Sequence, residues 1–265
     1  MSEDALSAPL SVVIPAYNEQ RRLGGTLRRI EQYFRSCSLR SEIIVVDDGS
    51  HDTTAAVARE FLSLYQGPSL LLINHRNRGK GYSARRGILA ASGERVLVCD
   101  ADLSTPVEEV HALLERQERE GWEIVIGSRA LPESRIEVHQ SLLRELLGRT
   151  FNLAVRLVSG LPYRDTQCGF KLLTRKAVLE VVRDLGIEGF AYDVELLWRA
   201  LRAGLRVGEH PVRWRNSPKS SVSMLTDAPR MLWDLLRLRR EMGRAPVSGT
   251  GRKEVAALPA GGERP

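Results

Sequence analysis

The sequence contains few cysteines and no long hydrophobic run, and each shortage excludes a class of protein. Cys37, Cys99 and Cys168 are far apart and form no C-x-x-C pair, which argues against a disulfide framework and a zinc site. No apolar stretch approaches the roughly 20 residues that span a bilayer. The N-terminus lacks the basic start and apolar stretch of a signal peptide. We therefore expect a protein of a reducing compartment that is neither secreted nor integral to a membrane.

Aromatic residues are also scarce, and acidic residues are outnumbered. Lys and Arg total 39 against 33 Asp and Glu, a formal net charge of +6, which favours anionic partners. The basic residues are dispersed and only 6% of residues are aromatic, so nucleic acid is a less favoured partner than phosphates or acidic lipid. At 265 residues, the chain is long enough to bury a substantial core.

Short β-branched runs alternate with amphipathic stretches along the first half of the chain. The predicted strands are Leu10–Ile14, Glu42–Val46, Leu70–Ile73, Arg95–Cys99 and Glu123–Ile126. The predicted helices are Thr26–Phe34, Thr53–Leu64, Tyr82–Ala91, Thr105–Glu120, Val138–Val158, Thr174–Arg183, Asp193–Ala203 and Met224–Met242. This alternation predicts one α/β domain over residues 1–243, with a mostly parallel sheet flanked by helices. Residues 244–265 are small, polar and rich in Pro and Gly, and we expect an unfolded tail.

Acidic residues follow two of the predicted strands. Asp47 and Asp48 end the second, and Asp100 and Asp102 follow the fourth. Single acids often cap the next helix, but crowded carboxylates oppose one another unless a cation or donor lies between them. Asp100 and Asp102 would offer one or two oxygens to Mg²⁺ or Mn²⁺, leaving the other positions to water and a diphosphate. Such an ion would act as a Lewis acid on a leaving diphosphate.

The stretch Asn77–Gly81 brings glycine amides, a helix N-terminus and Lys80 together, a combination that favours phosphate. The alternative is a plain turn with an exposed lysine. The spacing does not fit the P-loop, and no G-x-G-x-x-G follows the first strand, which counts against a dinucleotide-binding dehydrogenase.

Six motifs in order carry a family resemblance. They are P-A-Y-N-E (15–19), V-V-D-D-G-S (45–50), N-R-G-K-G (77–81), D-A-D (100–102), G-S-R (127–129) and R-D-T-Q-C-G-F-K-L (164–172). The set resembles the family 2 glycosyltransferases of the GT-A fold, and within them the dolichyl-phosphate β-glucosyltransferases and their prokaryotic polyprenyl-phosphate relatives. The resemblance implies a Rossmann-like sheet with a donor-binding half over about 10–130 and an acceptor- and membrane-facing half over about 131–243.

The resemblance also implies the roles of individual residues. The metal ligands would be Asp100 and Asp102, and Arg129 would lie beside the donor or acceptor phosphate. The nucleotide-sugar site would comprise Pro15, Ala16, Tyr17, Glu19, Asp47, Asp48, Lys80, Asp100, Ala101 and Asp102. Which of Asp47 and Asp48 reads the base stays open.

The chemistry of the acceptor decides whether a base is needed. A polyprenyl phosphate is already anionic at pH 7 and needs positioning, whereas a sugar hydroxyl would need a carboxylate base. Asp193 stands where hydroxyl-using relatives have that base, but Tyr192 replaces the preceding Glu. Asp193, Asp165 and Glu195 could therefore orient the sugar or brace loops instead.

Three basic residues are candidates for the acceptor phosphate. One is Arg129. The other two, Arg213 and Lys219, lie in a separate stretch that resembles the family's acceptor loop. The alternative for that stretch is a solvated basic loop. Lys171 lies in the most specific motif, although by itself it could equally be a surface lysine.

Two amphipathic stretches suit an acidic membrane surface. One apolar stripe comprises Ala228, Met231, Leu232, Leu235 and Leu238, and a second comprises Leu142, Leu143, Leu146, Leu147, Phe151, Ala154 and Val158. The alternative is packing onto the sheet.

Together with the polar motifs, the resemblance implies a metal-dependent, inverting enzyme that moves a hexose, glucose from UDP-glucose, to a polyprenyl phosphate. We expect it to be cytoplasmic, at the cytoplasmic face of a membrane. The alternatives are a soluble transferase acting on a sugar or small-metabolite hydroxyl, and a noncatalytic nucleotide-sugar-binding scaffold.

Overall fold

A computed structural model describes residues 10–138, 142–215 and 227–241. The expected tail over 244–265 and the candidate residue Lys219 lie outside these ranges.

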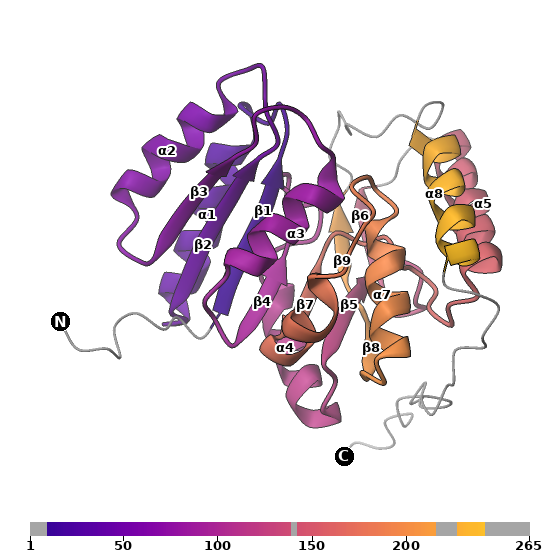
Figure 1. The fold of residues 1–265 in the computed structure, drawn as a ribbon. Coiled ribbons are helices and arrows are strands. Elements are labelled where there is room, and N and C mark those ends of the chain that lie inside the picture. Colours follow the sequence, from indigo (N-terminus) through magenta and orange to yellow (C-terminus); the bar gives the residue numbers. More distant parts are fainter. Residues whose placement is uncertain (1–9, 139–141, 216–226, 242–265) are drawn as a thin grey trace, which may run out of the picture.

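The centre of the molecule is a seven-stranded sheet with the order β3-β2-β1-β4-β7-β5-β8. Its strands are β1 (Leu10–Ala16), β2 (Ser41–Asp47), β3 (Ser69–Ile73), β4 (Arg95–Val98), β5 (Ile124–Ser128), β7 (Lys171–Thr174) and β8 (Val207–Pro211). Only β7 runs antiparallel to its neighbours, β4 and β5. The predicted α/β class and the mostly parallel sheet are therefore confirmed (Figure 1).

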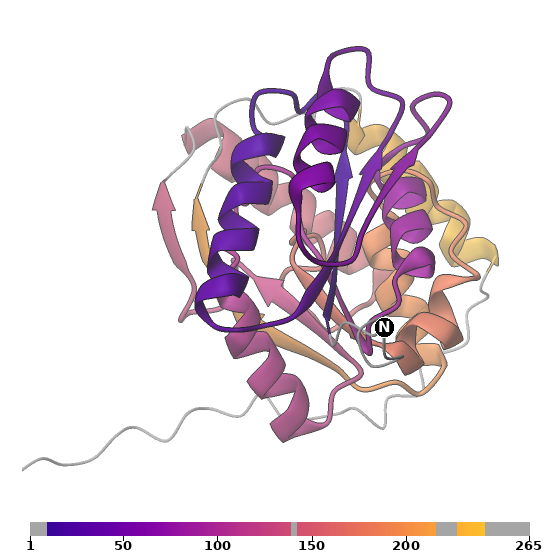
Figure 2. The same cartoon turned by 90° about the vertical axis from the view of Figure 1, so that its left-hand side faces the viewer.

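Helices cover both faces of the sheet, because successive strand residues point to opposite sides. Val12 and Ile14 pack in one cluster with Leu27 and Leu113, from α1 (Leu23–Ser36) and α4 (Glu109–Glu120). On the same face lies α2 (Thr54–Leu64). Val13 packs on the other side, against α3 (Lys80–Ala90) and α7 (Tyr192–Arg202). Figure 2 shows the resulting layers.

The second half of the chain differs more from the sequence prediction. Strands β6 (Arg135–Val138) and β9 (Arg213–Arg215) form a small separate sheet. Of the helix predicted over Val138–Val158, Val138 belongs to β6 and the residues from Leu142 onward belong to α5 (Leu142–Ser159). The stretch predicted over Thr174–Arg183 is confirmed as α6 (Arg175–Ala177), which continues into a π-helical turn at Val178–Val182.

The last helix, α8 (Asp227–Glu241), packs against α5 and α7. Met231, Leu235 and Leu238 are buried in the core, so the prediction that this stripe faces a membrane is wrong: it packs onto the domain. Different residues are exposed, namely Trp233 and Leu236 on α8 and Leu153 and Leu157 on α5. Within the described ranges, no helix is both long and apolar enough to cross a bilayer.

Candidate active site

The carboxyl ends of β1, β2 and β4 bring three polar motifs to one edge of the sheet. Ala16 lies opposite Asp47 in the register of β1 and β2, and the Asp48 N–H donates to the Ala16 carbonyl at 2.8 Å. On the other side, the Thr26 hydroxyl donates to the Ala101 carbonyl at 2.6 Å. These motifs are neighbours in space, as expected where parallel strands end together.

The segment after β1 is tied to the segment after β2. The Asn18 N–H donates to Ser50 Oγ at 2.9 Å, and the Tyr17 ring meets His51 edge to face, with centroids 6.4 Å apart. Pro15 lies opposite Val46 in the strand register. The predicted nucleoside residues Pro15, Ala16 and Tyr17 thus adjoin the aspartates that follow β2.

The two aspartates after β2 have different surroundings, although both are buried. Asp48 accepts hydrogen bonds from Asn74 Nδ2 at 2.7 Å, from the Arg78 N–H at 3.0 Å and from the Gly79 N–H at 2.7 Å. Asp47 accepts one, from the Ser50 N–H at 3.3 Å, and its Oδ1 has no partner in the described part of the chain. Asp48 therefore anchors the 77–79 loop.

Lys80 lies under this loop and contacts Asp100. Gly79 has a φ of 109°, and a Cβ there would lie 2.5 Å from the Glu188 carbonyl oxygen, so this position requires glycine. Lys80 begins α3, and its Nζ lies 2.5 Å from Asp100 Oδ1. Although partial burial disfavours both charges, the pair raises the pKa of Lys80 and lowers the pKa of Asp100. The alternative of an exposed turn lysine is wrong.

Asp102 lies beside a second ion pair, between Glu19 and Arg22. Arg22 Nε donates to Glu19 Oε2 at 2.6 Å, and Arg22 Nη1 lies 3.5 Å from Asp102 Oδ2. Burial raises the pKa of Glu19, and the negative charges of Asp102 and Asp100 add to this effect. The carboxylates after β1 and β4 thus share one electrostatic environment.

The residues present fit a divalent cation whose coordination shell is completed by oxygens of a bound ligand. Within the ranges that the structure describes, no group of three or more His, Cys, Asp or Glu side chains could hold a metal alone. The Asp100 side chain is 37% exposed and so remains accessible. A Cβ on Gly169 would lie 2.0 Å from Asp100 Oδ2, so the absence of a side chain there makes room for this carboxylate. Two aspartates with oxygens from a diphosphate and water are a suitable set for Mg²⁺ or Mn²⁺.

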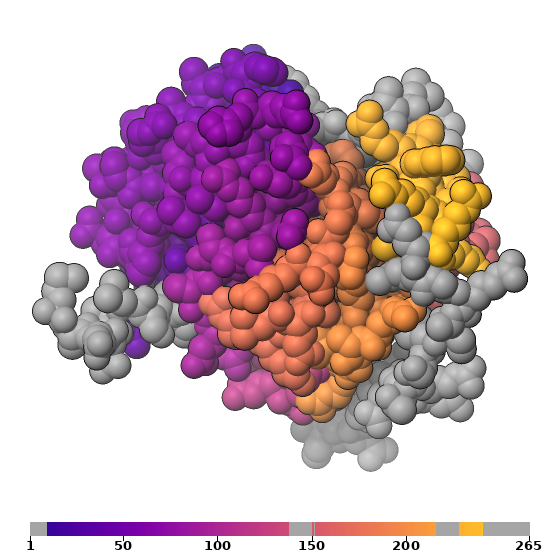
Figure 3. Space-filling model, viewed as in Figure 1, coloured from indigo at the N-terminus to yellow at the C-terminus, as the bar shows by residue number. Residues whose placement is uncertain are grey.

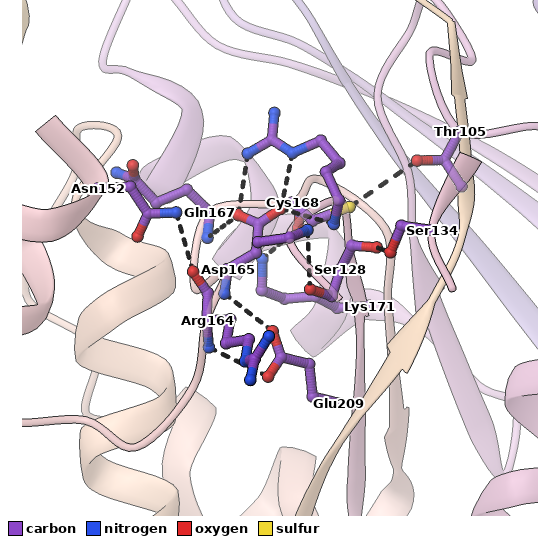
Figure 4. A network of polar contacts seen from close by, with 12 residues as sticks. Thr105, Ser128, Ser134, Asn152, Arg164, Asp165, Gln167, Cys168, Lys171 and Glu209 are labelled. Carbon is purple, nitrogen blue, oxygen red and sulfur yellow. Dashed lines mark hydrogen bonds and ion pairs between the residues drawn. The ribbon is translucent and has the colours of Figure 1, made fainter. Parts of the chain in front are cut away.

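An ion pair between half-buried Arg129 and buried Asp165 lies on the far side of β4. Asp165 is 1% exposed and accepts from the Arg129 N–H at 3.0 Å, from Arg129 Nε at 2.7 Å and from Nη2 at 2.9 Å. Although burial opposes ionisation, Arg129 lowers the pKa of Asp165. The Asp165 N–H in turn donates to Glu209 Oε1 at 2.8 Å, within the network of Figure 4. Arg129 Nη1 makes no hydrogen bond to any part of the chain that is described.

Asp193 is also buried and paired. It is 3% exposed, and its Oδ1 lies 2.6 Å from Lys171 Nζ. Lys171 is 1% exposed and also donates to the Cys168 carbonyl, so it is not a surface lysine. The negative charge of Asp193 is thus neutralised inside the protein.

Glu195 braces a loop against the base of α3. Its carboxylate accepts from the Gly186 N–H at 3.0 Å, from the Ile187 N–H at 2.7 Å and from Arg199 Nε at 2.8 Å. The same loop accepts the Tyr82 N–H at the Glu188 carbonyl, at 3.1 Å. This geometry matches the loop-bracing role that the sequence left open for Glu195.

Comparison with known proteins identifies the family. Residues 11–181 match the family described as Glycosyl transferase family 2. The chain belongs to this family. It is a glycosyltransferase.

Relatives of this glycosyltransferase include named enzymes. It is 36% identical to the dolichyl-phosphate beta-glucosyltransferase of Mus musculus, over 89% of this chain and 76% of the relative. It is 34% identical to the enzyme of the same name from Dictyostelium discoideum, over 87% of this chain and 73% of the relative.

The fold is that of the GT-A glycosyltransferases. The structure resembles glucosyl-3-phosphoglycerate synthase from Mycobacterium tuberculosis, solved with Mn²⁺, UDP-glucose and phosphoglyceric acid. The TM-score is 0.63 at 20% identity, over 86% of this chain and 78% of that chain. The predicted GT-A fold is confirmed.

Two residues predicted to contact the acceptor phosphate are not placed beside Arg129 and Asp100 by the structure. Arg213 on β9 forms an ion pair with Glu109 of α4 at 2.5 Å, and Lys219 lies outside the described residues.

A hollow of about 460 Å³ adjoins the 77–79 loop between α7 and α8 and is lined in part by Arg230, Asp234 and Arg237. In Figure 3 it lies between the yellow surface of α8 and the orange surface of α7.

The sequence analysis missed Arg22 and the function of Gly169. Arg22 follows Glu19 by three residues, a spacing that places both on one face of a helical turn. That spacing was the available signal. For Gly169 the signal was its place in the most specific motif, but its contact with Asp100 depends on the pairing of β4 with β7.

Proposed function

We propose that this glycosyltransferase moves glucose from UDP-glucose to the phosphate of a dolichyl or polyprenyl phosphate, with inversion, using Mg²⁺ or Mn²⁺. The names of its relatives support the lipid acceptor and the sugar. The UDP-glucose and Mn²⁺ complex of its structural neighbour is consistent with the donor and the metal. The observation that carries the proposal is the burial of Asp193 against Lys171, because a buried, ion-paired carboxylate is not exposed to a hydroxyl acceptor and a phosphate acceptor needs no base.

On the donor side, residues at the carboxyl edge of the sheet hold the nucleotide sugar. Pro15, Ala16, Tyr17, Glu19 and one of Asp47 or Asp48 hold the nucleoside. Asp100 and Asp102, joined by Ala101, hold the metal. A bound divalent ion supplies Lewis acidity toward the leaving diphosphate, and Lys80 lies close enough to Asp100 to contact that diphosphate.

On the acceptor side, Arg129 holds the attacking phosphate. Asp165 binds two nitrogens of its guanidinium and fixes its plane, which leaves Nη1 to donate to an anion. A phosphate monoester has a second pKa near 6 and is ionised at pH 7, so its oxygen attacks C1 opposite the diphosphate without a proton transfer. Asp193 and Asp165 then act as positioning residues. Arg213 and Lys219 are proposed as further acceptor contacts, Arg213 through release of its pair with Glu109.

We propose that α5 and α8 rest on the cytoplasmic face of a membrane, where the lipid acceptor is held. Trp233 is 64% exposed and Leu157 is 71% exposed, and exposed Arg230 and Arg240 flank the apolar side chains on α8. Exposed aromatic and aliphatic groups with neighbouring cations suit an anionic interface. The division into a donor half over about 10–130 and an acceptor half over about 131–243 belongs to this proposal.

The test is transfer in a defined mixture. The full chain, UDP-glucose, Mn²⁺ and a short polyprenyl phosphate should give a glucosylated lipid, and EDTA should abolish it. The matching polyprenyl alcohol, which lacks the phosphate, should give none. Transfer only to a sugar or metabolite hydroxyl would establish the soluble-transferase alternative. Nucleotide-sugar binding without turnover on any acceptor would establish the scaffold alternative.

A further inference from the structure

Protein cations accompany both aspartates of the proposed metal site. Lys80 Nζ lies 2.5 Å from Asp100 Oδ1, and Arg22 Nη1 lies 3.5 Å from Asp102 Oδ2. Two carboxylates this close in sequence repel one another unless positive charge lies nearby. Lys80, as the closer cation, contacts the same carboxylate that would ligate the metal.

The position of Lys80 is built into the fold. The Gly79 N–H before it is held by Asp48 Oδ2 at 2.7 Å. The Tyr82 N–H after it is held by the Glu188 carbonyl. The Lys80 side chain is only 19% exposed, and its ammonium contacts Asp100 inside the site. Moving the ammonium into solvent would break this contact.

A divalent ion and an ammonium compete for one carboxylate oxygen, because like charges a few ångströms apart repel strongly in a partly buried site. The neighbouring cations Arg129 and Lys171 are engaged with Asp165 and Asp193. A diphosphate changes this balance, since its oxygens attract both an ammonium and a metal.

We propose that Lys80 makes metal binding conditional on the nucleotide. Its ammonium neutralises Asp100 in the nucleotide-free enzyme, and it transfers to a diphosphate oxygen when a nucleoside diphosphate enters with a divalent cation. Lys80 is thus a positioning residue with two alternative partners, Asp100 and the diphosphate. Its contact with Asp100 disfavours binding of the metal without the nucleotide. This inference rests on the proposed function, because it takes Asp100 as a metal ligand.

The experiment measures Mn²⁺ binding to the full chain by electron paramagnetic resonance, without nucleotide and then with UDP. Lys80→Met should bind Mn²⁺ alone at least about tenfold more tightly than the wild type, because the competing charge is gone. With Mn²⁺ present, it should bind UDP at least about tenfold less tightly. Lys176→Met is the matched control: it removes the same charge from an exposed lysine that pairs with Glu123, and both affinities should stay at the wild-type level.

Opposite changes in the two affinities are not produced by a general loss of structure. The proposal is overturned if Lys80→Met binds Mn²⁺ alone no more tightly than the wild type, or if Lys176→Met gains as much. If Lys80→Met does not fold, Lys80→Gln is held to the same criteria. Asp100→Asn distinguishes failure of the proposed metal site from failure of the proposal about Lys80. If this variant binds Mn²⁺ with UDP as well as the wild type does, the assignment of Asp100 as a metal ligand fails. If it does not, but Lys80→Met is unchanged, only the role of Lys80 fails.

Discussion

At the residue scale, the site depends on ion pairs between motifs that are distant in sequence. The pairs are Lys80 with Asp100, Arg129 with Asp165, and Lys171 with Asp193. Five of these six residues stand in the six motifs of the family resemblance, and Asp193 lies outside them. The pairing of Arg129 with Asp165 and of Lys171 with Asp193 was not predictable, because it depends on β7 lying between β4 and β5. This is why Asp193 remained a candidate base and Lys171 a candidate surface residue until the structure placed them.

Substitution of the two aspartates after β2 should affect folding unequally. Asp48→Asn places an amide where three N–H donors converge, so it should lower the free energy of unfolding by about 2 kcal/mol. Asp47→Asn keeps one acceptor for Ser50 and puts its amide where Oδ1 has no partner. It should lower that free energy by less than about 1 kcal/mol. Urea unfolding at pH 7.5 measures both, and equal losses would refute this reading of the loop anchor.

Acid should destabilise the fold through His210 on β8. Burial, with Arg116 and Arg119 nearby, lowers the pKa of His210 from 6.5 to about 4. The unfolded chain therefore binds a proton more readily between these values, and stability is lost as pH falls through 6.5 toward 4. From pH 7.5 to 5 the wild type should lose about 2 kcal/mol more than His210→Asn. Urea unfolding at both pH values is the measurement, and parallel losses would show that His210 is not responsible.

At the element scale, the helices and strands with a clear periodic pattern of apolar residues were the ones that the sequence predicted. Strands β1 to β5 and helices α1 to α4 were predicted because apolar residues recur at strand or helix spacing there. Strands β6, β7, β8 and β9 were missed, since segments of three to five residues that contain charged residues or proline are too short to show a pattern. The π-helical turn at Val178–Val182 likewise has no signal of its own beyond that of an ordinary helix.

Helix α8 provides a test of membrane contact. Trp233→Ala combined with Leu236→Glu should reduce binding to anionic phospholipid vesicles at least about fivefold, because it removes exposed apolar surface and adds negative charge. Leu64→Glu is the control: Leu64 is 72% exposed but lies on α2, at the other end of the molecule (Figure 1). Vesicle co-sedimentation measures all three proteins. Equal binding by the α8 variant and the wild type would contradict this orientation.

At the scale of the whole molecule, the gathering of the polar motifs at one edge of the sheet was predictable, and the packing of the last helix was not. Parallel strands that end in polar motifs must gather those motifs at one edge, and the alternation of strands and helices was visible in the sequence. The packing of α8 against α5 and α7 was not predictable, because a helix with apolar residues on two faces does not show which face turns inward.

The most direct test of the central claim is the structure of the reaction product. Incubation of the full chain with UDP-[1-¹³C]glucose, Mn²⁺ and a short polyprenyl phosphate, followed by ¹³C and ³¹P nuclear magnetic resonance, identifies the bond that forms. We predict a β-configured glucosyl C1 coupled to the phosphorus of the lipid phosphate. Labelled glucose that is released free, or bonded to a carbon-borne hydroxyl, would contradict the claim.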